Sequence, residues 1–417
     1  PPRSTLFPYT TLFRSYMYDV IIIGGGAAGL FAAVNLKTEH ALLLDHSHEV
    51  GKKLLITGSG QCNLTNTLPV EAFLSHFGNK QQRNFLLPSL QNFTTQTLYE
   101  WFEQRGFPLI VRSDDKVFPK SLDARDVRDF LVSHSKAHIR TNMHITAITA
   151  LHPGFRITTT DAAYDTRNLI IATGGMSYPR TGSDGSGYDL AKTLGHSIVP
   201  PKPALVALSI EEYPFKHLAG NSVRDAWVSL YHNEEKAAYE QRKGDVLFTH
   251  DGLSGPAILS CSRFVRKQDV IKLSLIGGAN HHEAEEILLR ALSAPKKLIT
   301  TALKETGIIS SLAQTLVDMA GIERDTTTAT LDKTKRKALA NLVSALPLRV
   351  SGSKGFQSAM VTSGGVALSE VNRKTMESNL NKGLFFCGEM LDYDGESGGY
   401  NLQAAFSTAY LAVQHIR

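Results

Sequence analysis

Short apolar runs and one helical pattern set the framework for the first part of the chain. Residues 18–23 (YDVIII) and 41–44 (ALLL) are almost wholly apolar and predict strands buried on both faces. Residues 27–37 between them predict a helix. Further apolar strands are expected at 169–172 and 384–387, far along the chain. This order predicts an α/β fold built on a parallel sheet.

A glycine pattern joins the first strand to the first helix. Gly24, Gly26 and Gly29 have the spacing G-x-G-x-x-G, and Asp45 ends the second strand. Such a turn lets a pyrophosphate approach the backbone, the helix N-terminus attracts its charge, and the acid can accept hydrogen bonds from a ribose. The sequence therefore predicts a bound dinucleotide, with these expected contacts: Gly24, Gly26, Ala27, Ala28, Gly29 and Asp45.

The other end of the chain indicates which dinucleotide is bound. The strand at 384–387 runs into Gly388-Glu389, and Gly399 precedes a final helix. In flavoproteins of this fold, an acid at such a strand end reaches the ribityl chain. The next helix directs its N-terminus at the flavin edge where charge collects on reduction. The sequence thus favours FAD, contacted here by Gly388, Glu389, Gly399, Tyr400 and Asn401.

Residues 169–196 supply a third glycine cluster. An apolar strand breaks at Thr173-Gly174-Gly175 and continues through a Gly/Ser-rich loop into a helix. This pattern is typical of the return strand of an FAD domain, which passes beneath the pyrophosphate. An ordinary connection between a strand and a helix needs fewer glycines.

Composition narrows the class of protein. The 417 residues are 42% hydrophobic and 20% charged, as in soluble globular proteins, and a chain of this length is expected to form two or three domains. No apolar run approaches the ~20 residues that a membrane span needs. Cys62, Cys261 and Cys387 are too far apart for a disulfide framework or a zinc site. We expect a cytoplasmic protein with no metal and no membrane partner.

The first residues and the net charge add little. Residues 1–15 (PPRSTLFPYTTLFRS) nearly repeat themselves and lack the apolar core of a signal peptide, so we interpret them as a non-native or disordered leader. The net charge of +5 permits a polyanionic partner without requiring one.

Six stretches together resemble the BaiN/RdsA family of NAD(P)/FAD-dependent oxidoreductases. They span nearly the whole chain after the leader, and the segments around Cys62 and Tyr400 are specific to the family. The stretches are DVIIIGGGAAGL, GKKLLITGSGQCNLTN, KVFPKSLDARDV, IIATGGMSYPRTGSDGSGYDLAKTLGH, VLFTHDGLSGPAIL and CGEMLDYDGESGGYNLQAAFSTAYLA.

The resemblance implies a Rossmann-like FAD-binding domain in two pieces, residues 16–200 and 351–417. Alternating stretches within 201–280 predict a small inserted β-barrel, and residues 281–350 predict an inserted helical domain. The chain has no second Rossmann fingerprint and no redox CxxC motif. NADH or NADPH, as a transient electron donor, would therefore dock directly against the flavin.

In the family context, the loop after Asp45 lies over the flavin. The family usually has arginine where this chain has Lys52 and Gln61, so two bidentate guanidinium groups are lost, and Gln61 supplies no charge for an anion contact. The residues of this loop expected to contact FAD are Lys53, Gly58, Gly60, Cys62 and Asn63.

Cys62 and His250 are the catalytic candidates. Cys62 is either a small residue packed in the glycine-rich loop or a thiol that gives a proton to a substrate carbon as hydride leaves the flavin. His250 follows a predicted strand, and is either a proton donor that faces the flavin or a turn residue. The sequence leaves both alternatives open.

The resemblance implies hydride addition to an activated C=C bond. Our working hypothesis is the reduction of uridine to dihydrouridine in large-subunit (23S) rRNA. A small-molecule ene-reductase or amine oxidase and a non-catalytic flavin-binding module are the alternatives. Cations of the helical insertion would release counterions from RNA, unless they only form a solvated face. They are Lys296, Lys297, Lys304, Lys333, Lys335, Arg336 and Lys337.

Overall fold

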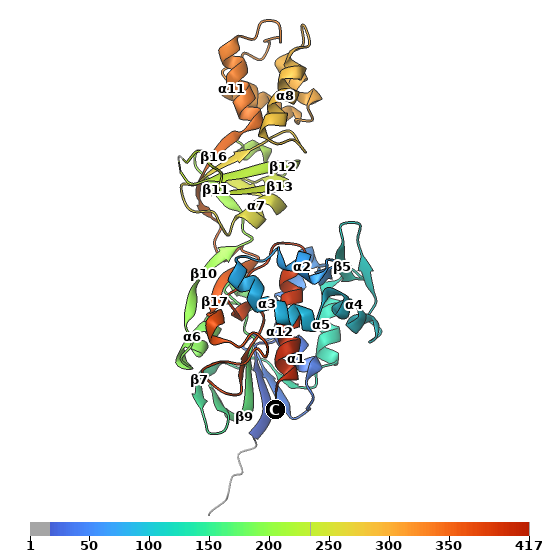
Figure 1. Cartoon of the computed structure of the whole chain (residues 1–417), viewed down its shortest axis with the longest axis vertical. Coiled ribbons are helices and arrows are strands. Elements are labelled where there is room, and N and C mark those ends of the chain that lie inside the picture. Colours follow the sequence, from blue (N-terminus) through green and yellow to red (C-terminus); the bar gives the residue numbers. More distant parts are fainter. Residues whose placement is uncertain (1–16, 234, 417) are drawn as a thin grey trace, which may run out of the picture.

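The computed structural model describes residues 17–233 and 235–416, so the predicted leader at 1–15 lies outside the described residues. Figure 1 shows an elongated molecule with three parts along one axis: an α/β domain, a barrel in the middle and a helical tip. The predicted fold class is confirmed: a discontinuous Rossmann-like domain with an inserted barrel and inserted helices.

A seven-stranded sheet forms the centre of the α/β domain. Its strands in the described chain are β1 (Met17–Ile23), β2 (Ala41–Leu44), β6 (His138–Arg140), β7 (Ile145–Ala150), β8 (Phe155–Thr159), β9 (Ala163–Ile171) and β18 (Leu384–Phe386). Strands β6, β2, β1 and β9 pair in parallel in that order, and β18 pairs in parallel with the last part of β9. The first part of β9 pairs antiparallel with β8, which continues to β7.

The helices of the α/β domain pack on this sheet and on one another. They are α1 (Ala27–Asn35), α2 (Val70–Leu74), α3 (Lys80–Asn92), α4 (Thr95–Glu103), α5 (Ala124–Ser133), α6 (Ser186–Thr193) and α12 (Tyr400–Gln414). Helix α12 contacts α1 and α3, and α1 also contacts α5. Residues 28–34 of α1 are all buried, as expected for a helix that is apolar on every side. A small antiparallel sheet of β3 (Thr65–Asn66), β5 (Lys116–Pro119) and β4 (Leu109–Val111) lies beside them.

Two strands carry the chain out of this domain and back. Strand β10 (Ile198–Ala204) leads to the barrel, and β17 (Val361–Val366) returns from it, paired antiparallel with β10. Strand β10 contains three prolines (IVPPKPA), which lack the N–H that a central strand must donate. A two-stranded ribbon tolerates them because each strand has one free edge.

The barrel is closed by six strands in the order β11, β14, β13, β12, β15, β16. Their bounds are Leu208–Ile210, Gly252–Ser254, Glu240–Phe248, Ser222–Tyr231, Val270–Leu273 and Leu346–Ser353, respectively. The last strand lies beyond the range of 201–280 predicted for the barrel. Strand β16 pairs with both β11 and β15, and the barrel closes only with this strand, which arrives after the helices.

The helical tip lies between β15 and β16. It consists of α8 (His281–Leu292), α9 (Ile299–Glu305), α10 (Ser310–Met319) and α11 (Lys333–Ser344). Its buried residues join those of the barrel in one hydrophobic cluster, whereas the α/β domain has a cluster of its own. The tip and the barrel therefore share a core, because four short amphipathic helices bury part of their apolar surface against the barrel.

Candidate functional site

A cavity of about 380 Å³ lies at the carboxyl ends of β1, β2 and β9. This is the edge of a doubly wound sheet where ligands generally bind. The cavity brings together residues from both ends of the α/β domain. The predicted contacts that line it are Gly24, Gly26, Ala27, Ala28, Asp45, Lys53, Thr173, Gly174, Glu389 and Asn401.

The three glycines of the fingerprint have different surroundings. Gly24 has a φ of +101°, and a Cβ there would lie 2.6 Å from the carbonyl oxygen of Ala172. A Cβ at Gly29 would overlap the carbonyl oxygen of Gly24, so this glycine lets α1 pack on the turn. A Cβ at Gly26 would meet no protein atom within 4 Å, although Gly26 lines the cavity. The missing side chain of Gly26 thus leaves open space where a pyrophosphate fits.

Two helix N-termini point at the cavity. Helix α1 begins after Gly26 and α12 after Gly399, and neither has a side-chain cap or an acidic residue in its first turn. Ala27 and Ala28 line the cavity from α1, and Asn401 lines it from α12. Uncapped N–H groups and the positive end of the helix dipole favour anionic groups. The residues present therefore fit a dinucleotide.

Asp45 closes the glycine turn. One of its carboxylate oxygens accepts a hydrogen bond from the N–H of Gly25 (2.6 Å), and the other accepts one from the N–H of Ser47 (2.7 Å). Each oxygen has further lone pairs, so the carboxylate can also accept hydrogen bonds from a ribose.

Lys53 and Glu389 form an ion pair at the cavity across 336 positions of sequence. The Nζ of Lys53 lies 2.6 Å from Glu389 Oε2 and 2.5 Å from the hydroxyl of Ser177. The other oxygen of Glu389 accepts hydrogen bonds from Ser177 Oγ (2.8 Å) and from the N–H of Thr362 on β17 (2.7 Å). This network fixes a carboxylate beside the cavity and connects it to the strand that returns from the barrel.

The segment that follows β9 approaches this network closely. Thr173 and Gly174 line the cavity, whereas Gly175 lies behind it, where a Cβ would overlap the hydroxyl of Thr362. Gly388 also does not line the cavity, and a Cβ there would lie 2.7 Å from the Cβ of Ala28 on α1. These two glycines allow close packing of the segments around the cavity.

The loop at 57–63 reaches the cavity through Thr57, while Gly58, Gly60, Cys62 and Asn63 do not line it. Cys62 is fully buried, and its φ of +59° is a left-handed conformation that is strained for a non-glycine residue. Burial raises the pKa of its thiol to about 12, against a smaller opposing effect of the hydrogen bond to Thr57. A thiol in this environment keeps its proton, and the packing alternative is the better supported one.

Asn63 connects this loop to the last helix. In the amide orientation that satisfies its neighbours, its side chain donates to the carbonyl of Thr65 and accepts from the N–H of Gly399 at 3.0 Å. Tyr400 does not line the cavity; its ring lies against Phe73 and His76.

His250 lies away from the cavity. It is exposed in the turn between β13 and β14 of the barrel and is not among the cavity residues. Its neighbour Asp251 forms an ion pair with Lys354. These surroundings favour the turn role over the alternative of a proton donor.

Several cavity residues were missed by the sequence reasoning. His144 and Ile145 come from β7 and the loop before it, Asp184 comes from the loop before α6, and Met360 immediately precedes β17. His144, Ile145 and Met360 belong to no motif, so only the folded arrangement of these segments could identify them. Asp184 lies within the glycine-rich stretch at 169–196, which was a signal that could have found it. Among residues 17–233 and 235–416, no three or more His, Cys, Asp or Glu side chains are grouped to hold a metal ion. No helix in the same ranges could cross a membrane.

Comparisons with known proteins agree with this geometry. Residues 18–415 match the family model described as the HI0933-like protein Rossmann domain. The chain belongs to this family. It is an FAD-dependent oxidoreductase, and the resemblance to the BaiN/RdsA family is confirmed.

Three relatives are similar to this chain over nearly their whole length. A ribosomal RNA dihydrouridine synthase of Haemophilus influenzae is 31% identical over 94% of this chain and 96% of its own. A 3-dehydro-bile acid delta(4,6)-reductase of Clostridium scindens is 30% identical over 95% and 98%. A ribosomal RNA dihydrouridine synthase of Escherichia coli is 29% identical over 96% and 98%.

The open space at Gly26 gives a test of the FAD site. We expect Gly26→Val to leave the apoprotein folded, with a Tm within about 2 °C of wild type, because a Cβ at this position meets no protein atom within 4 Å. The same variant should purify colourless, because its side chain fills the space of the pyrophosphate. Gly29→Ala is the matched control, and should lower the Tm of the apoprotein itself. A yellow, fully loaded Gly26→Val protein would contradict the assignment.

The three cysteines should be unreactive in the native protein. Cys62, Cys261 and Cys387 are buried, and burial raises the pKa of each thiol to about 12. We expect Ellman's reagent at pH 8 to label less than about half a thiol per chain until denaturant is added. Rapid labelling of native protein that disappears in Cys62→Ala would instead mark Cys62 as an accessible, reactive thiol.

Asp392 should make stability depend on pH. Burial, and then the charge of Asp394, raise the pKa of Asp392 to about 6 from its ordinary value near 4. A raised pKa stabilises the fold below about pH 4, and this contribution is lost as the pH rises through about 6. Asp392→Asn should therefore unfold at higher urea concentration than wild type at pH 8, with the difference shrinking at pH 4.5. An equal or lower midpoint at pH 8 would disprove the assigned pKa shift.

Proposed function

We propose that this FAD-dependent oxidoreductase reduces uridine to dihydrouridine in large-subunit rRNA, with NADH or NADPH as the electron donor. Bound FAD would supply hydride transfer to the activated C=C bond of the base. Residues of the cavity bind and orient the cofactor: Gly26 and the N-terminus of α1 hold the phosphates, and the N-terminus of α12 faces the flavin edge. Asp45 and Glu389 accept hydrogen bonds from the hydroxyl groups of the cofactor. The observation that supports rRNA as the substrate lies at the other end of the molecule.

A cluster of unpaired cations lies on α11. Lys333, Arg336 and Lys337 are exposed and Lys335 is half-buried, and no ion pair or side-chain hydrogen bond joins these four side chains to another described residue. Elsewhere in the tip, Lys297 pairs with Glu305 at 2.8 Å. Cations without an acidic partner are available to phosphates, and displacement of counterions from RNA then favours binding.

The position of the cluster also suits a large substrate. Figure 1 shows α11 in the tip, at the opposite end of the molecule from the α/β domain. A small molecule held at the flavin cannot also touch α11, whereas a folded rRNA can reach both. The target base must leave its stack to meet a flavin, so such an enzyme needs both a pocket and a distant phosphate-binding surface.

Reduction of a small conjugated molecule is the second candidate. It is favoured by the bile acid reductase of Clostridium scindens, which is 30% identical to this chain. This reaction is also hydride addition to a conjugated system, and would use the same cavity. It predicts no dependence of activity on the cations of α11.

Removal of the α11 cations separates the two candidates. In the variant in which Lys333, Lys335, Arg336 and Lys337 are all alanine, we expect weaker binding of rRNA and a flatter plot of log K against log salt. Its slope should fall by about one for each side chain that contacts a phosphate. Flavin reduction by NADH or NADPH should be unchanged. The matched control removes four exposed cations of the α/β domain, Lys37, Lys80, Lys374 and Lys382.

Mass spectrometry of rRNA nucleosides tests the substrate directly. A strain lacking the gene should lose one dihydrouridine, which the wild-type gene and the control variant restore and the α11 variant restores poorly. If the rRNA of the deletion strain keeps every dihydrouridine, the rRNA function is disproved. Full restoration by the α11 variant would instead remove the cation cluster from the proposal.

A further inference from the structure

A histidine–carboxylate pair lies beside the N-terminus of α12. The loop that precedes this helix contains Asp392, Asp394 and Glu396, and each has a different environment. Glu396 is joined to His76 twice. Its N–H donates to the carbonyl of His76 at 3.0 Å, and its Oε2 lies 2.8 Å from the Nδ1 of the His76 ring.

The ring of His76 is held in one orientation. It stacks on Tyr400, with ring centres 4.4 Å apart and planes 20° from parallel. Phe73 and Phe77 contact the same tyrosine, so α2 and the turn after it pack against the first residue of α12. A carboxylate at Nδ1 places a proton on that nitrogen, and leaves Nε2 as the atom that can take up or release one. In the described structure no side chain or backbone group bonds Nε2.

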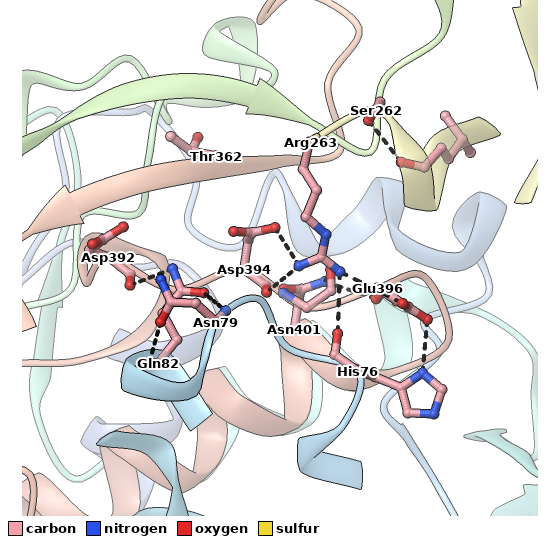
Figure 2. Close-up of polar contacts among 12 residues, drawn as sticks. His76, Asn79, Gln82, Ser262, Arg263, Thr362, Asp392, Asp394, Glu396 and Asn401 are labelled. Atoms are coloured by element: carbon pink, nitrogen blue, oxygen red, sulfur yellow. Dashed lines mark hydrogen bonds and ion pairs between the residues drawn. The ribbon is translucent and has the colours of Figure 1, made fainter. Parts of the chain in front are cut away.

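The pair lies at the junction of the α/β domain and the barrel. Asn401, which lines the cavity, donates to the carbonyls of Gly395 and Glu396 at 2.9 and 3.2 Å. From the barrel side, Arg242 of β13 contacts Glu396 at 3.0 Å. Arg263, which follows α7 (Pro256–Cys261), donates to Asp394 Oδ2 at 2.9 Å and to the carbonyl of His76 at 3.3 Å. Figure 2 shows His76, Arg263 and the acidic loop converging at this junction.

The charged groups around His76 keep Glu396 ionised. Burial opposes its charge, but the hydrogen bond with His76 and the charges of Arg242 and Arg263 outweigh burial and lower the pKa of Glu396. Asp394 is buried and paired with Arg263. Tyr400 contributes a neutral ring. His76 therefore faces one carboxylate directly, with two guanidinium groups behind it, and is one-third exposed.

We propose that His76 is the proton donor of the reaction and that Glu396 positions it. This rests on the proposed function, in which a C=C bond is reduced. Bound reduced FAD would supply the hydride to one carbon of that bond and would itself be oxidised. Nε2 of the His76 imidazolium gives its proton to the other carbon, so that the C=C bond becomes a single bond. Neutral His76 then regains a proton from solvent through its exposed edge. His76 is not itself a cavity residue, but it stacks on Tyr400, whose neighbour Asn401 lines the cavity. Cys62 is buried in the core, and His250 lies in the barrel turn without such a connection.

Half-reactions measured without oxygen test this role. His76→Gln should keep FAD and be reduced by NADH or NADPH within about twofold of wild type. Oxidation of its reduced flavin by substrate should slow by about 10²–10⁴-fold, the usual contribution of a general acid, and lose its dependence on a protonated group. Glu396→Gln should slow this step less, because the ring keeps its place on Tyr400 but loses the carboxylate that orients it. His134→Gln, an exposed histidine on the capping turn of α5, is the control and should match wild type.

The state of the ring gives a readout that needs no substrate. In histidine-labelled apoprotein, NMR should show neutral His76 with its proton on Nδ1, and Glu396→Gln should release the ring from this single tautomer. Oxidation of reduced flavin at the wild-type rate in His76→Gln would overturn the proposal. If neither rRNA nor a conjugated bile acid oxidises reduced wild-type flavin, the proposed function fails. The tautomer of neutral His76 then still tests the histidine–carboxylate pair. A proton on Nε2 instead of Nδ1 would refute the proposed orientation of His76 by Glu396.

Discussion

The parallel pairing of β9 with both β1 and β18 is the constraint on which the site depends. The register aligns Ile23 with Ile171 and Ile171 with Phe386, so three strands end at one edge of the sheet. The side chains at these three positions are at most 3% exposed, and each contributes about 1.5–3 kcal/mol through burial of apolar surface. The turns that follow these strands come from residues hundreds of positions apart. They nevertheless meet at a single cavity, because parallel strands place their carboxyl ends together.

The charges at this edge follow from the same geometry. Two uncapped helices direct their positive ends at the cavity, and these would attract any anion. Glu389 is kept beside them by Lys53, Ser177 and the N–H of Thr362, so that its charge is compensated within the protein. Without such partners, the carboxylate would be an uncompensated charge at the wall of the cavity. The pairing therefore preserves an acceptor for the hydroxyl groups of the cofactor.

The inserted part has a different relation to the sheet. The barrel and the tip bury their apolar residues in a cluster of their own, and a two-stranded ribbon connects them to the α/β domain. The connection is reinforced by polar contacts, since Arg242 and Arg263 reach the acidic loop before α12. An insertion with its own core can carry a binding surface far from the cavity without disturbing the sheet. The same polar contacts place barrel residues next to the histidine–carboxylate pair, so the two parts meet where the chemistry is proposed.

The sequence alone determined the features that depend on neighbours along the chain. Strands of continuous apolar residues, the spacing of Gly24, Gly26 and Gly29, and the acid after β2 each report a local backbone requirement, and the Rossmann-like class followed from them. It did not reveal that β16 closes the barrel, because closure depends on pairing with β11 and β15. It also could not decide whether Cys62 packs in the loop or donates a proton, because the sequence of a glycine-rich loop does not show whether its thiol is buried or exposed. Only the tertiary structure placed His76 against Glu396, 320 positions away, because hydrogen bonds between distant segments leave no periodic signal in either one.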